Sequence, residues 1–60
     1  MNKKELKETV DYTVFLLNSR LEEFKHAQIL NQCNNQDFWY WQGKIEAMEE
    51  AINRVKEINQ

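Results

Sequence analysis

Proline is absent from this sequence of 60 residues, and glycine and cysteine each occur once. With so few turn-forming residues, the chain is a poor candidate for a β-rich fold. A single cysteine, Cys33, excludes an internal disulfide. A chain this short buries only about 60% of the surface that it exposes when unfolded, so its own core is marginal. Since neither a disulfide nor a Cys/His cluster supports the fold, we expect oligomerisation to do so.

No charge of one sign dominates, and long apolar runs are missing. Eight basic and ten acidic residues leave a formal net charge of −2. At the N-terminus Lys3, Lys4 and Lys7 alternate with Glu5 and Glu8, which is ordinary surface charge and makes nucleic acid an unlikely partner. No apolar run reaches the roughly 18 residues of a membrane span, and the N-terminus lacks the apolar stretch of a signal peptide. We therefore expect a cytoplasmic protein with no membrane partner.

Groups for catalysis or metal binding are also scarce. The only histidine, His26, lies seven residues from both Ser19 and Cys33, which is about 10 Å along a helix and too far for a hydrogen bond. Glu22 and Glu23 precede His26 at helical spacing, but a di-iron site needs such ligands from several helices. We predict no catalytic residue, no metal site and no cofactor, and hence a protein that is not an enzyme.

Apolar residues recur at alternating spacings of three and four in two segments, which predicts two helices with a coiled-coil seam. The two stripes are Val10, Val14, Leu17, Leu21, Phe24 and Gln28, and Phe38, Trp41, Ile45, Met48, Ile52 and Val55. A polar, asparagine-rich segment separates them. We predict one domain over residues 1–60: an all-α antiparallel hairpin with a helix at 3–31, a connection at 32–36 and a helix at 37–58.

A turn centred near Asn34 sets the register between the two stripes. Phe24 then faces Ile45, and the layers further from the turn are apolar on both sides. Gln28 would face Trp41, where the indole N–H is within reach of the amide.

A second apolar face flanks the seam on one side of both predicted helices. Its residues are Leu6, Thr13, Leu16, Ala27, Leu30, Tyr40, Ala47, Ala51 and Ile58. One hairpin cannot cover this face by itself. We predict a homodimer in which two hairpins form a four-helix bundle, with these residues at the interface. The alternatives are a monomer with an exposed apolar flank and a complex with a helix of another protein.

A third set of apolar residues falls at outward positions. Tyr12, Phe15, Ile29 and Trp39 belong to it, and Gly43 follows Trp39 by one turn. Gly43 is either a tolerated exposed position, a space for a tryptophan ring, or part of a binding surface. We take Tyr12, Phe15, Trp39 and Gly43 as the candidate partner-binding residues, because Trp and Tyr dominate binding hot spots.

The segment Phe38–Ala47, with its aromatic run and the pattern Gln-Gly-x-Ile-x-Ala before an acidic helix, resembles the second helix of small uncharacterised bacteriophage and prophage accessory proteins. Many proteins of that class bind and inhibit a host protein, including defence proteins. The resemblance implies a phage-encoded inhibitor of a host protein in the host cytoplasm, and it carries no catalytic residues. Together with the homodimer predicted from the second apolar face, this predicts a dimeric inhibitor. Two alternatives stay open: a small scaffold protein that assembles through Gly43, and a regulator that contacts nucleic acid through Lys3–Lys7.

Overall fold

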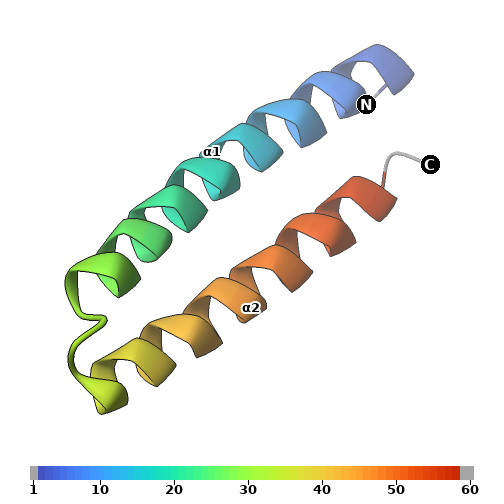
Figure 1. Cartoon of the computed structure of the whole chain (residues 1–60). Helices are drawn as coiled ribbons and strands as arrows, with labels where there is room; N and C mark the ends of the chain where they lie inside the picture. The colour runs from blue at the N-terminus through green and yellow to red at the C-terminus, as the bar shows by residue number, and fades with distance from the viewer. Residues whose placement is uncertain (1, 59–60) are drawn as a thin grey trace.

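The computed structural model describes residues 2–58 and shows two helices that lie side by side and antiparallel (Figure 1). Helix α1 spans Lys3–Leu30 and helix α2 spans Asn35–Glu57. The hairpin is long and flat, with extents of 48 × 15 × 11 Å. The predicted all-helical hairpin is thereby confirmed.

Asparagine caps begin both helices. The Asn2 side-chain oxygen accepts a hydrogen bond of 2.8 Å from the Glu5 N–H, and the Asn34 oxygen accepts one of 3.2 Å from the Asp37 N–H. These bonds satisfy N–H groups that the first turn of a helix leaves free. Because Asn34 is the cap, α2 begins at Asn35, two residues before the start predicted from the sequence.

Four residues, 31–34, connect the helices. The Asn31 N–H still donates to the Ala27 and Gln28 carbonyls at 3.1 and 3.2 Å, but the Asn31 backbone, at φ −111° and ψ 17°, leaves the helical conformation, so α1 ends at Leu30. The Asn34 N–H donates to the Asn31 carbonyl at 3.0 Å. Throughout residues 2–58 no backbone φ is positive. The turn therefore needs neither glycine nor proline, which explains how a chain nearly free of both still forms a tight hairpin.

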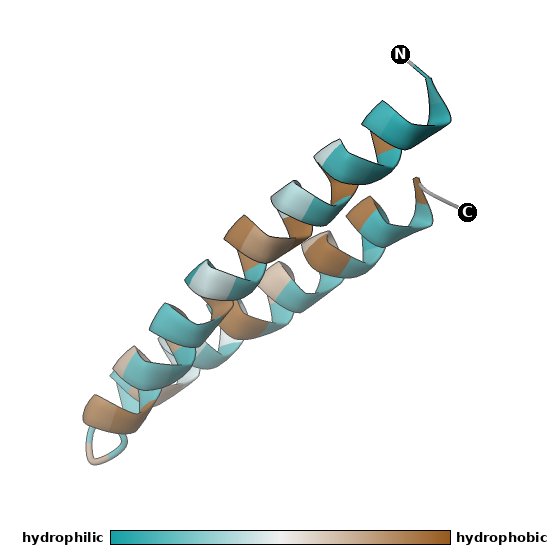
Figure 2. Cartoon of the chain, turned by 90° about the horizontal axis from the view of Figure 1, so that it is seen from above, coloured by the Kyte–Doolittle hydropathy of each residue, from teal (hydrophilic) through white to brown (hydrophobic). Residues whose placement is uncertain are grey.

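The core lies between the helices and consists of residues from the two predicted stripes. Four side chains expose only 5–7% of their surface: Val10, Leu21, Ile45 and Ile52. Half-buried neighbours pack against the cluster that Leu21 forms with the two isoleucines: Val14, Leu17, Phe24 and Met48. The apolar segments recur along both helices in Figure 2. Packing of these side chains holds the hairpin together.

Gln28 joins the two helices through a polar contact that differs from the predicted one. Its amide nitrogen donates to the Gln42 side-chain oxygen at 2.7 Å and to the Phe38 carbonyl at 3.4 Å. The Trp41 ring packs instead against Phe24, with 5.7 Å between ring centroids. Gln42 is the residue after Trp41 on α2. Because its amide can both donate and accept hydrogen bonds, it satisfies the half-buried Gln28 amide better than an indole N–H alone.

Charged side chains on the solvent-facing surface of both helices form local ion pairs. The ion pairs within residues 2–58 each join side chains of one helix: Arg20 with Glu23, Lys25 with Glu22, and Arg54 with Glu50. They are solvent-exposed and contribute little to stability. Neither helix, over its described length, combines the length and apolar character that crossing a bilayer requires.

Candidate protein-interaction surface

The hairpin exposes more large apolar side chains than it buries. Eight such side chains within residues 2–58 are exposed, against the four buried core residues: Tyr12, Phe15, Leu16, Ile29, Leu30, Trp39, Tyr40 and Ile58. The accessible surface is 4932 Å², whereas a compact monomer of this mass exposes about 4,200 Å². A single hairpin therefore leaves a large apolar surface exposed to solvent.

A shallow apolar groove of about 300 Å³ runs along one side of the hairpin. Its lining residues are Leu17, Phe24, Lys44, Ala47, Met48 and Ala51. Leu17, Phe24 and Met48 belong to the seam, but they stay half-buried because nothing covers them from this side. Ala47 and Ala51 lie one helical turn apart, and their short side chains leave the space that forms the groove.

The groove lies on the face that the sequence predicts as the dimer interface. Ala47 and Ala51 line it directly. Leu16, Leu30, Tyr40 and Ile58 lie on the same side by helical spacing and are 46–72% exposed. The remaining predicted residues, which share this side, are half-buried: Leu6, Thr13 and Ala27. Ala47 and Ala51 are thus at the groove itself, and helical spacing along α1 and α2 puts the rest of the predicted set on the same side.

Lys44 stands among three aromatic rings at one end of the groove. Its ammonium nitrogen lies 5.0 Å from the Tyr40 ring centroid, 5.2 Å from Trp41 and 5.4 Å from Phe24. None of the ion pairs in the described part of the chain includes Lys44. Sequence reasoning did not single out this residue. Its spacing of four from Tyr40 and three from Trp41 is the signal that could have found it.

The other side of the hairpin is different in character. A smaller hollow of about 200 Å³ there is lined by Asn18, Leu21, Glu49, Ile52, Asn53 and Lys56. Amide and charged side chains surround the two apolar residues, and water satisfies such groups well. Of these two hollows along residues 2–58, the Ala47–Ala51 groove is the apolar one, and it lies on the side of the exposed Leu16 and Tyr40.

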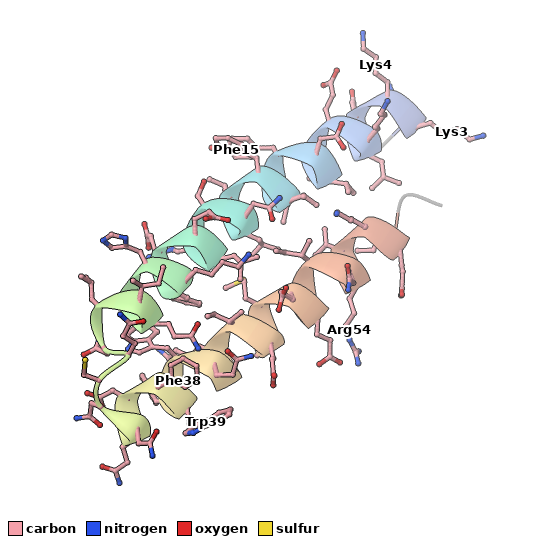
Figure 3. All side chains as sticks on the ribbon, viewed as in Figure 1. Lys3, Lys4, Phe15, Phe38, Trp39 and Arg54 are labelled. Atoms are coloured by element: carbon pink, nitrogen blue, oxygen red, sulfur yellow. The ribbon has the colours of Figure 1, made fainter. Side chains whose placement is uncertain are left out.

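The outward aromatic residues form two separate groups. Tyr12 and Phe15 lie one turn apart on α1, and Trp39 lies near the start of α2; each is 64% exposed. Figure 3 shows the Phe15 and Trp39 side chains pointing to opposite sides of the hairpin. Along the helix axes they are also roughly 20 Å apart by helical rise. Within one copy, Trp39 is therefore grouped with Gly43 and not with Phe15.

Gly43 faces open space. A Cβ atom placed on it would meet no atom within 4 Å, so in the hairpin Gly43 does not make room for a tryptophan ring. Its backbone conformation is an ordinary helical one with negative φ. The glycine thus costs helix stability without a reason inside the chain.

Gly43→Ala is expected to stabilise the hairpin by about 1 kcal/mol, because alanine loses less backbone entropy in a helix and has room here. Urea unfolding measures the change. The reverse substitution on the same helix, Ala47→Gly, should lower the stability of the single hairpin by a similar amount, when both variants are measured at concentrations too low for a dimer. A destabilised Gly43→Ala variant would show that a close contact exists at this position.

The groups weighed for catalysis and metal binding remain apart. The Ser19 hydroxyl donates to the Phe15 carbonyl at 3.1 Å, while His26 and Cys33 are exposed. Across residues 2–58 no three Asp, Glu, His or Cys side chains gather closely enough to hold a metal ion.

Comparison of the chain with protein-family models, curated proteins and solved structures finds no match. Its surface is therefore the evidence for what it does.

Proposed function

We propose that the chain is a non-enzymatic protein-binding module that works as a homodimer, with two hairpins packed into a four-helix bundle. The observation that carries this proposal is the excess of exposed over buried large apolar side chains. Burying Leu16, Leu30, Tyr40 and Ile58 at about 25 cal/mol per Å² would stabilise each copy by an amount comparable with the whole stability of a small domain. The half-buried seam residues of the groove add to this gain.

The second copy covers one face and leaves the outward aromatic residues free. Tyr12, Phe15, Trp39 and Gly43 are then available to a protein target. Tyrosine and tryptophan bury a large area at low entropic cost, and here they are held on helices. A dimer presents each group twice, which adds avidity against a multimeric target.

The resemblance of Phe38–Ala47 to phage accessory proteins supports a role as a phage-encoded inhibitor of a host protein, such as a defence protein, in the host cytoplasm. An inhibitor of this kind needs only a binding surface, and exposed aromatic side chains on helices supply one.

Sedimentation equilibrium of the full chain tests the assembly. A mass of twice 7.3 kDa is expected at micromolar concentration. A mass of 7.3 kDa over the whole accessible range would contradict the homodimer. Open-ended growth with concentration would instead favour the scaffold alternative, in which Gly43 lies in a contact between copies.

Trp39→Ala is expected to preserve the fold and the proposed dimer while lowering target capture severalfold, because the side chain is 64% exposed and its ring lies edge-on to Phe38, at 5.2 Å between ring centroids. Affinity capture from a bacterial host lysate with quantitative mass spectrometry measures the loss, and circular dichroism checks the fold. Ile29→Ala, a similarly exposed change outside the proposed binding set, is the control. Equal capture by both variants would exclude Trp39 as a hot spot, and an unfolded Trp39→Ala protein would assign it to the core.

A further inference from the structure

We infer that the two copies of the proposed homodimer lie with their connections at the same end, so that α1 of each copy covers α2 of the other and Glu23 pairs with Lys44 of the second copy. This inference rests on the homodimer proposed above. It adds the orientation of the copies and names the ion pair that selects it.

Two-fold symmetry allows two ways to stack the flat groove faces of two hairpins. If the axis runs along the hairpin, both connections lie at one end and α1 lies over α2 of the partner. If the axis runs across the hairpin, the connections lie at opposite ends. In that case α1 lies over α1 of the partner, and α2 lies over α2 of the partner. Charge on the face decides between the two.

Contacts inside one hairpin show which residues lie at the same level along its length. The Lys44 ammonium lies 5.4 Å from the Phe24 ring, so Glu23, the neighbour of Phe24, is level with Lys44. Glu23 shares the groove side, since it is seven residues from both Leu16 and Leu30. The same-end arrangement therefore places Glu23 of each copy over Lys44 of the other.

The charge at Lys44 fits such a partner. Its ammonium is surrounded by Phe24, Tyr40 and Trp41, and no carboxylate of the described residues forms an ion pair with it. Aromatic faces stabilise a cation, and a carboxylate from a second chain would complete its coordination on the open side. Glu23 is 64% exposed in the hairpin and can reach outward while remaining near Arg20.

The opposite-end arrangement brings like charges together. An axis across the centre of the groove passes between Ala47 and Ala51 on α2 and close to Arg20 on α1. It therefore sets Arg20 against Arg20 of the partner, and it places Lys44 over Ala51 of the partner, which offers no carboxylate. Like charges at an interface are costly, so this arrangement is disfavoured.

The same-end arrangement also covers the exposed apolar side chains. Leu16 lies over the notch at Ala51, and Leu30 lies over Tyr40. A face of 48 × 15 Å offers roughly 700 Å² per copy, or about 1,400 Å² in total, which is within the range of stable protein interfaces. The area thus suffices for a dimer without further contacts.

The native cysteine reports the orientation directly. Cys33 is free, exposed and located in the connection. In the same-end dimer the two thiols lie at one end of the bundle, and a bis-maleimide that spans the roughly 10 Å between packed helices joins them. In the opposite-end dimer they are roughly 40 Å apart by helical rise, and this reagent cannot join them.

Cross-linking of the dilute wild-type chain should thus give a covalent dimer, and Leu16→Glu, which removes the interface, should abolish it. Glu23→Lys should weaken the dimer at least about tenfold, because it replaces both Glu23–Lys44 ion pairs across the interface with pairs of like charge. Glu22→Lys makes the same charge change on another face and should leave the dimer unaffected. Glu23→Lys combined with Lys44→Glu should restore association.

Three results would overturn the inference. A dimer that the reagent fails to join excludes the same-end orientation alone and leaves the homodimer intact. Equal dissociation constants for Glu23→Lys and Glu22→Lys exclude the Glu23–Lys44 pair. A wild-type chain that is monomeric in sedimentation removes the homodimer itself.

Discussion

Leu16→Glu is expected to convert the proposed homodimer into a monomer. In a single hairpin Leu16 is 46% exposed, so the fold tolerates a charged side chain there. In the proposed bundle the same position lies against the second copy, where a buried carboxylate without a partner is strongly unfavourable. Sedimentation equilibrium should show a fall from twice 7.3 kDa to 7.3 kDa, accompanied by a lower melting temperature.

Ile29→Glu provides the matched control. Ile29 is 60% exposed and lies on the outward side of α1, so the same kind of change should leave the mass of the dimer as it is. If Leu16→Glu also leaves the mass unchanged, the groove face is not where the copies meet.

Ile52→Ala is expected to lower the free energy of unfolding by about 2–5 kcal/mol. Ile52 exposes only 5% of its surface and packs in the cluster with Leu21 and Ile45. Truncation removes buried methyl groups and leaves a cavity that two helices cannot easily close. Since small domains have little stability to spare, the urea concentration at the midpoint of unfolding should fall sharply, as circular dichroism will measure.

Ile29→Ala removes the same atoms at an exposed site and should cost less than about 0.5 kcal/mol. Met48→Ala lies between the two cases. Met48 is half-buried in the hairpin, so most of its loss should appear only at concentrations where the dimer forms. Equal losses for Ile52→Ala and Ile29→Ala would mean that the core lies elsewhere.

The fold could be predicted from the sequence because its determinants are local or periodic. All four buried residues belong to the two apolar stripes, and the stripe period fixes which side of each helix faces the other. Asn2 and Asn34 cap the helices through side chains three residues from their partners. Such contacts depend on spacing along one helix, which a sequence shows directly.

Contacts between the helices were harder to predict. Gln28 bonds to Gln42 and not to Trp41, because a shift of one position round α2 decides which side chain reaches the amide. The ring cluster around Lys44 also combines both helices, since Phe24 belongs to α1 while Tyr40 and Trp41 belong to α2.

The candidate site shows the same division. Heptad positions were sufficient to place Ala47 and Ala51 on one face, and the structure adds that this face is hollow. Periodicity gives a direction around one axis but no distance between outward side chains of two helices. For this reason the separation of Phe15 from Trp39 could be seen only in the structure (Figure 3).

The short connection between α1 and α2 has a kinetic consequence. Closing a loop of four residues costs little chain entropy, and the Gln28–Gln42 contact lies close to that loop. Helical proteins with such local contacts fold within microseconds to milliseconds, whereas encounter of two copies slows as the chain is diluted. A newly synthesised chain is therefore expected to complete its hairpin first, and in the proposed homodimer the finished hairpin is the species that meets the second copy.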